Sequence, residues 1–161
     1  MRPKGITLLE LVVVMAILAI LAGFSINWIR GAVQKQRIAK DVKLLFGALQ
    51  EARYQAFARK ATCGLLFGNA TFSSFEVRCD NGSDGNFTDD TSVLLQRSNL
   101  STPFTSGRTS VGFTKEGFTR DVTTVHPVEE ENLPEYSCIV VSMTRIKMGT
   151  WDARNAVCEI R

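Results

Sequence analysis

Four cysteines are the side chains of this sequence best suited to covalent chemistry. They lie far apart and form no C-x-x-C pair: Cys63, Cys79, Cys138 and Cys158. Because the chain has a single histidine, a zinc site has too few plausible ligands, and two disulfide bonds are the favoured interpretation. Such bonds persist in an oxidising compartment. Three pairings remain open, and the sequential one, 63 with 79 and 138 with 158, is the simplest for local strand pairs.

The sequence patterns that could indicate catalysis or metal binding are incomplete. His126 has no serine or cysteine partner in a recognisable nucleophile motif, and the sequence has no glycine-rich phosphate loop. Residues 80–90, DNGSDGNFTDD, have the oxygen density of a calcium loop. However, Gly82 stands where a ligand is expected and Thr91 where a bidentate glutamate belongs, which favours a polar turn. We therefore expect no enzyme activity, no metal and no cofactor.

Glu10 is a carboxylate within a long apolar run. Residues 6–28, ITLLELVVVMAILAILAGFSINW, would form roughly 30 Å of helix, which is enough to span a bilayer. A secretory signal peptide, a plain membrane anchor and a buried core helix are the ordinary interpretations of such a run. A carboxylate at membrane depth costs roughly 2.5–3.5 kcal/mol and is usually functional. Each ordinary interpretation leaves Glu10 unexplained.

The N-terminus carries a family resemblance. The basic leader MRPK, then Gly5, then ITLLE is similar to the class III signal of type IV prepilins and type II secretion pseudopilins. The resemblance implies that a prepilin peptidase cuts between Gly5 and Ile6 and methylates the new amino group of Ile6. Ile6 departs from the phenylalanine commonest at this position, a tolerated variation. Glu10 would then neutralise the cationic N-terminus of a neighbouring subunit during assembly.

The remaining sequence predicts an α+β fold. Apolar residues at helical spacing continue the helix to about Lys60, with basic residues between them: Ile38, Val42, Leu45, Phe46, Leu49, Ala52, Ala56 and Phe57. From Thr62 onward, short runs read as antiparallel strands: CGLLFG, SFEVRC, SVLLQRSNL, TSVGFT, EGFTR and SCIVVSMTRIKM. We expect a leader at 1–5, a protruding hydrophobic assembly segment at 6–30, and a β-rich head at 31–161 that includes the amphipathic half of the helix.

The resemblance narrows in the second half of the chain. The segments ALQEARYQAFARK, VGFTKEGFTR and CIVVSMTRIKM are together similar to the GspH/FimT branch of pilin-like proteins. These are minor subunits that initiate or tip filaments. The resemblance implies three kinds of partner: other pilin-like subunits, the prepilin peptidase and an inner-membrane assembly platform. It also implies a single-pass inner-membrane precursor with a periplasmic head, which later enters a pilus or pseudopilus.

Basic residues near the C-terminus could contact DNA. Strand alternation would place Arg145 and Lys147 on one outward face, and further candidates follow: Trp151, Arg154 and Arg161. This region resembles the basic C-terminus of FimT-type minor pilins that bind DNA in natural transformation, where cations hold phosphates and an exposed aromatic stacks on a base. The sequence departs from that motif, because it has Thr144 where glycine is usual and Lys147 where arginine is common. A merely solvated hairpin is the alternative.

Charge gives no general nucleic-acid signature, because the net charge is only +3. An acidic stretch around Pro127 and Pro134 predicts an exposed loop or a contact with the next minor subunit: Glu129, Glu130, Glu131 and Glu135. The sequence as a whole indicates a non-enzymatic minor pilin. A secretion pseudopilin and a DNA-binding pilus module remain open as alternatives.

Overall fold

The computed structural model describes residues 8–81 and 84–160, without the side chains of residues 22–28. The predicted cleavage residues Gly5 and Ile6, and the predicted basic residue Arg161, lie outside the described residues. The chain divides into two compact units, Met1–Gln34 and Lys35–Arg161, and we call the second unit the head. The division falls four residues beyond the sequence-based boundary at residue 30.

Helix α1 (Leu8–Arg59) is 52 residues long and contains no proline. It ends at Arg59 because Lys60 turns to a positive φ of 56°, the left-handed conformation that commonly closes a helix. This confirms the expected end near Lys60. Between Leu8 and Leu21 its side chains are exposed on every side. Among the described residues, no helix has an apolar stretch long enough to cross a membrane.

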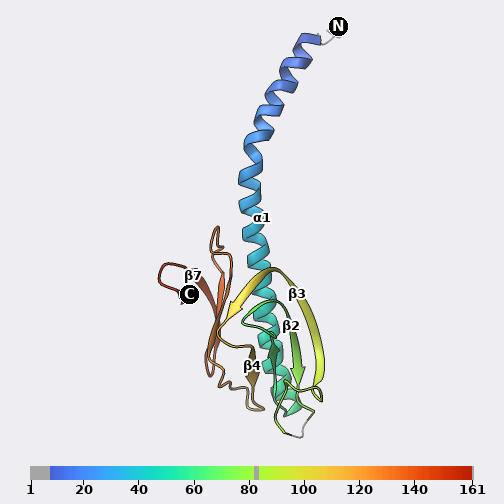
Figure 1. Cartoon of the computed structure of the whole chain (residues 1–161), viewed down its shortest axis with the longest axis vertical. Helices are drawn as coiled ribbons and strands as arrows, with labels where there is room; N and C mark the ends of the chain where they lie inside the picture. The colour runs from blue at the N-terminus through green and yellow to red at the C-terminus, as the bar shows by residue number, and fades with distance from the viewer. Residues whose placement is uncertain (1–7, 82–83, 161) are drawn as a thin grey trace, which may run out of the picture. The chain divides into compact units, whose positions relative to one another are not determined.

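The strands of the head form one antiparallel sheet of eight strands, ordered β4-β1-β2-β3-β5-β6-β7-β8 (Figure 1). Their bounds are β1 (Cys63–Leu66), β2 (Thr71–Cys79), β3 (Val93–Ser106), β4 (Ser110–Phe113), β5 (Thr123–Pro127), β6 (Cys138–Val141), β7 (Ile146–Asp152) and β8 (Val157–Ile160). A helix followed by antiparallel strands confirms the predicted α+β class. The segment EGFTR, predicted as a strand, is instead a turn: Gly117 has a φ of 80°, and its N–H donates to the Thr114 carbonyl.

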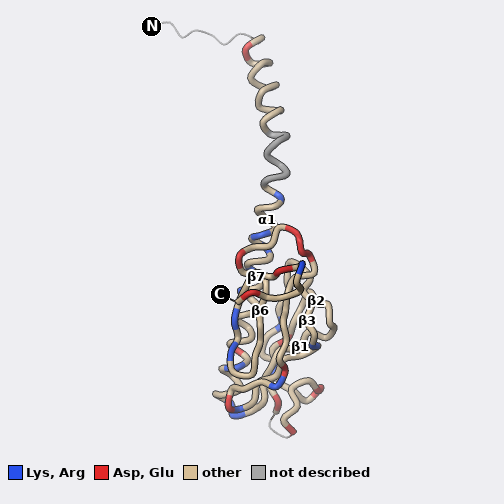
Figure 2. Tube along the Cα trace, turned by 90° about the vertical axis from the view of Figure 1, so that its left-hand side faces the viewer, with Lys and Arg blue, Asp and Glu red and all other residues tan. Residues whose placement is uncertain are grey.

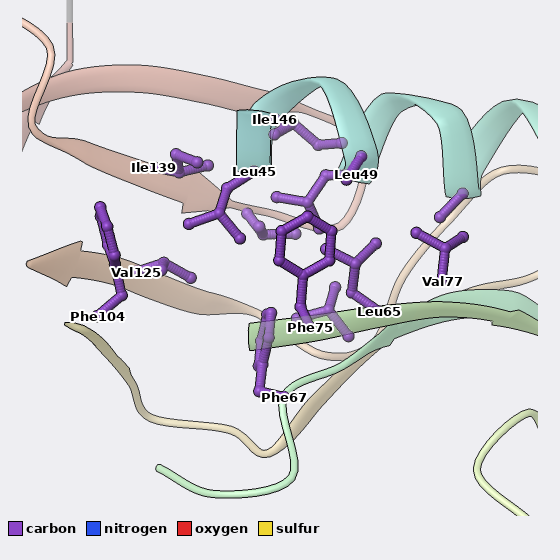
Figure 3. Close-up of a cluster of buried hydrophobic side chains, with 14 of the residues drawn as sticks. Leu45, Leu49, Leu65, Phe67, Phe75, Val77, Phe104, Val125, Ile139 and Ile146 are labelled. Carbon is purple, nitrogen blue, oxygen red and sulfur yellow. The ribbon is translucent and has the colours of Figure 1, made fainter. Parts of the chain in front are cut away.

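The core of the head lies between the second half of α1 and one face of the sheet (Figure 3). Leu45 and Leu49 of the helix meet side chains from β1, β2, β5 and β6, all of them buried: Leu65, Phe75, Val77, Val125 and Ile139. Burying each such side chain contributes about 1.5–3 kcal/mol. The helical spacing of these apolar residues thus predicts the buried face correctly, except that Phe57 is 57% exposed.

Asp41 fastens the helix to the sheet from within this core. Its side chain is buried, and its Oδ2 atom accepts three hydrogen bonds from β3. The Ser101 N–H donates at 2.8 Å, the Thr102 N–H at 2.9 Å and the Thr102 hydroxyl at 3.0 Å. Hydrogen bonds to a charged acceptor are stronger than neutral ones. Asp41 therefore fixes the position of β3 along the helix.

Candidate functional site

Glu10 lies in the first turn of α1, with its side chain on an exposed apolar surface. Negative charge is favourable at this end of a helix, where backbone N–H groups lack partners. The neighbouring side chains Leu8, Leu9 and Leu11 are all more than half exposed. In this unit, therefore, a carboxylate stands on a surface that is otherwise suited to packing against apolar partners.

Two of the predicted basic residues, Arg145 and Lys147, lie close together at one end of β7. Arg145 closes the tight turn from β6, where its N–H donates to the Ser142 carbonyl and its carbonyl accepts from Ser142. Both side chains are exposed. Arg154 is also exposed, but it lies beyond the opposite end of β7, which has seven residues and is therefore about 23 Å long. The three of these cations that the structure describes, Arg145, Lys147 and Arg154, do not form one compact cluster.

Trp151 corrects a prediction, because it is not an exposed surface for stacking a base. The side chain is 8% exposed, and its ring stacks on His126 with centroids 3.6 Å apart and planes 7° from parallel. Its indole N–H donates to Glu130 at 3.3 Å. With one face against His126 and the ring buried beside Cys138 and Cys158, it serves as the centre of a second, smaller core.

The acidic segment 128–136 folds across the outer face of the sheet and covers this second core. Besides Glu130, it is held by the Thr150 hydroxyl, which donates to the Glu135 carbonyl at 2.5 Å. The following residue, Ser137, donates its N–H to the Gly149 carbonyl and accepts from the Trp151 N–H. Figure 2 shows acidic residues in red at the end of the head away from the C-terminal end of α1, which is where Figure 1 has this segment. The segment therefore has exposed carboxylates on a fixed backbone.

His126 is half-buried under this segment, and burial lowers the pKa of its imidazole below the ordinary value. Two weaker influences raise the pKa: the Pro127 carbonyl, 3.1 Å from Nδ1, and the nearby charge of Glu130. Burial dominates because an imidazolium loses hydration there. His126 thus acts as a neutral aromatic partner of Trp151.

The disulfide bonds join Cys63 to Cys79 and Cys138 to Cys158, which is the sequential pairing. Cys63 and Cys79 are directly opposite each other on β1 and β2. The second bond links β6 to β8, and Gly149 of β7 lies beside it. A Cβ atom at Gly149 would be 3.0 Å from the Cys158 Sγ and would clash with the Glu159 carbonyl. Glycine is required there to let the strands and the bond approach closely.

In the segment 80–90, the described residues 80–81 and 84–90 have the hydrogen bonding of polar turns. Asp80 Oδ2 accepts from the Gly85 N–H at 3.0 Å, and Asp84 accepts from the Asn86 N–H at 2.9 Å. Phe87 then covers β1 and β4, where Gly64 and Gly112 are paired and leave space for its ring. Among the residues that the structure describes, no three side chains suited to metal binding come together.

Comparison with known proteins gives one match to the N-terminal segment and two matches to the fold. Residues 1–26 match the family model for the prokaryotic N-terminal methylation motif. The structure is similar to two crystal structures of the type IV minor pilin FimU from Pseudomonas aeruginosa, with TM-scores of 0.51 and 0.53. Identity is 12% and 11%, and the matches cover 68% and 71% of this chain and 90% of the other chain. The sequence matches no curated protein.

Sequence reasoning missed two structural features of the head. Neither the His126–Trp151 stack nor the anchoring role of Asp41 was predicted, because in each case the partner is distant in sequence. One signal was present for Asp41: a lone acid on the apolar helix face, between Ile38 and Val42. A charged residue at such a position is rarely buried without a partner.

Proposed function

From a type IV pilin-like N-terminus and fold, we propose that this chain is a minor type IV pilin. It is made as a precursor anchored in the bacterial inner membrane and cut between Gly5 and Ile6. It is then methylated at Ile6 and incorporated into a filament through residues 6–30. Residues 31–161, which include the head, are the part that the filament displays. The proposed role is structural, and the chain supports assembly rather than catalysing a reaction.

The proposal is supported by two findings that occur together in one chain. The methylation motif occupies residues 1–26 of the same chain whose head has the fold of a minor pilin. Glu10 supplies the chemistry, since an apolar helix with one carboxylate can neutralise the amino group that cleavage creates on a neighbour. A type II secretion pseudopilin shares the N-terminal chemistry and is the alternative. Loss of the chain would then reduce protein export rather than piliation.

The first test is the mass and N-terminal sequence of the protein from membranes with and without the prepilin peptidase. A peptidase-dependent start at Ile6 carrying one methyl group is expected. A start at Met1 in both membranes would refute the proposal and leave a plain anchor.

A second test replaces Glu10. Glu10→Ala should leave insertion and cleavage intact but strongly reduce incorporation into filaments, measured by immunoblot of sheared fractions. Glu10→Asp, which keeps the charge, is the matched control and should retain more incorporation. Normal incorporation of Glu10→Ala would contradict the assigned role.

We also propose a role in DNA uptake, in which the protein contacts the phosphates of duplex DNA and stacks no aromatic ring on a paired base. Because Trp151 is buried, exposed cations must carry any binding: Arg145, Lys147 and Arg154. Such contacts are independent of sequence and weaken steeply with salt. Duplex DNA should be retarded by the protein in detergent micelles at low salt, and Arg145→Ala/Lys147→Ala should reduce this retardation. No retardation by the unchanged protein would refute the role in DNA uptake.

A further inference from the structure

An exposed apolar patch lies at the end of the head where the chain turns from β6 into β7. Three large side chains form it, each about half exposed: Phe118 at 48%, Val122 at 56% and Met143 at 59%. The Thr119 N–H donates to the Met143 carbonyl at 3.0 Å, which joins the segment before β5 to the turn between β6 and β7. Val122 directly precedes β5, which pairs with β6. Apolar side chains that gather in solvent beside charged ones mark binding surfaces.

Cations surround this patch. The segments 108–122 and 142–147 contain five cations and two acids, so their net charge is +3: Arg108, Lys115, Arg120, Arg145 and Lys147 against Glu116 and Asp121. All five cations are exposed. Arg120 follows Phe118 by two residues, and Arg145 follows Met143 by two. These two short segments therefore carry as much net positive charge as the whole chain.

The two acids of these segments lie beside cations of their own. Asp121 accepts a hydrogen bond from a backbone N–H of β4 at 3.0 Å through Oδ2, and its Oδ1 lies 3.8 Å from the Arg108 Nη1. Glu116 lines a surface hollow together with two lysines, Lys60 and Lys115. The positive charge closest to the apolar patch therefore remains in excess.

The acidic segment 128–136 limits this surface on the outer face of the sheet. It is held where the Glu135 carbonyl accepts from the Thr150 hydroxyl. Thr150 follows Lys147 by three residues, which is about 10 Å along β7. Charges are screened over about 8 Å at physiological ionic strength. The glutamates therefore repel an anion only weakly at the patch and more strongly beyond Lys147.

A level part of the sheet connects the patch to Lys147. Thr124, Val140 and Lys147 are side by side on β5, β6 and β7. They alternate with Ile139 and Val141, which are buried in the core, so they lie on the opposite face. Thr124 and Val140 are only half-buried. An extended chain can therefore lie across the three strands from the patch to Lys147.

We propose that this surface binds DNA with unpaired bases, and that Phe118 stacks on one of them. A single strand presents a flat base and a phosphate at each nucleotide, which suits apolar side chains interleaved with cations. In an intact duplex the bases are stacked on one another, so the same cations contact only phosphates. Phe118 thereby supplies the exposed ring that Trp151, being buried, does not. The inference rests on the proposed role in DNA uptake and adds the class of DNA that binds most tightly.

Fluorescence anisotropy of the full chain in detergent micelles at low salt tests the preference. The probes are a labelled strand of about 20 nucleotides without self-complementarity and the same strand annealed to its complement. The unchanged protein should have a lower Kd for the single strand. Phe118→Ala should raise that Kd about tenfold, which corresponds to the loss of one stacked base, and leave the Kd for the duplex unchanged. Tyr136→Ala, which removes an exposed ring among the glutamates, is the matched control and should change neither Kd.

A fluorescent ring at the same position reports stacking directly. Phe118→Trp should keep the low Kd for the single strand, and its added fluorescence should be quenched when the strand binds. The unchanged protein, with the same two native tryptophans, gives the background signal. Quenching of equal size by the duplex, or no quenching beyond the background, would show that the ring at position 118 does not stack on an unpaired base.

The outcomes for the two proposals are distinguishable. An equal Kd for the two forms of DNA, or normal binding of the single strand by Phe118→Ala, would overturn this inference. If Phe118→Ala binds DNA normally but enters filaments poorly, the patch contacts a neighbouring subunit and not DNA. Binding of neither form by the unchanged protein would refute the role in DNA uptake itself. Retardation of duplex DNA that depends on Arg145 and Lys147, without any preference for the single strand, would refute only the stacking site.

Discussion

Replacement of Asp41 gives the sharpest test of how the head is held together. Asp41→Ala removes the acceptor of three hydrogen bonds, from two N–H groups and one hydroxyl of β3. A buried donor left without a partner costs about 1–3 kcal/mol. Ser101 is exposed, so water can satisfy its N–H, whereas Thr102 is buried and both its donors stay unpaired. The expected loss of unfolding free energy is therefore about 3 kcal/mol, or roughly a hundredfold in the equilibrium.

One further variant and a control resolve this loss. Asp41→Asn keeps a neutral acceptor and should cost about 1–1.5 kcal/mol, because hydrogen bonds to a charged group are stronger. Glu51→Ala, on the exposed side of the same helix, removes only a bond from Gln55 and should cost about 0.5 kcal/mol or less. Guanidinium unfolding in detergent, followed by near-ultraviolet circular dichroism, measures all three. Equal losses for Asp41→Ala and Glu51→Ala would refute the anchoring role.

Two other predictions concern the second core. Cys138→Ala/Cys158→Ala removes the bond that closes a loop of about 20 residues. The unfolding free energy should fall by about 3 kcal/mol in the same assay. An unchanged unfolding midpoint would contradict a stabilising role of the disulfide bond. Stability should fall as the pH drops from about 6.5 through the lowered pKa of His126, because the unfolded chain then binds the proton more readily than the folded one. The His126→Gln variant should lose this part of the pH dependence of the unfolding free energy, measured from pH 7.5 to 5. An identical slope in both proteins would mean that other groups cause the pH dependence.

Several features could be predicted because their signals are local. The leader, Gly5 and Glu10 form a continuous motif, and the match at residues 1–26 supports the predicted family resemblance. Apolar residues from Ile38 to Ala56 repeat with the period of a helix, so they identify its buried face without knowledge of what covers it. Alternating segments such as SFEVRC likewise identified strands, and they do form part of β2.

Short elements were predicted less well, because their structure depends on contacts with distant segments as well as on the local sequence pattern. EGFTR contains apolar and β-branched residues, but Gly117 adopts a positive φ and makes it a turn. β5 and β8 were not predicted as strands, and they form because neighbouring strands supply their hydrogen bonds.

Alone, the sequence determined the N-terminal motif, the long helix and the class of fold, since each depends on residues adjacent in the chain. Tertiary structure decided which side chains remain available for binding. Trp151 became a core residue because the acidic segment folds over it. Phe57 stayed in solvent because its side chain is turned away from the buried face of α1 on which Ala52 and Ala56 lie. Burial depends on contacts between distant segments, which composition and spacing do not specify.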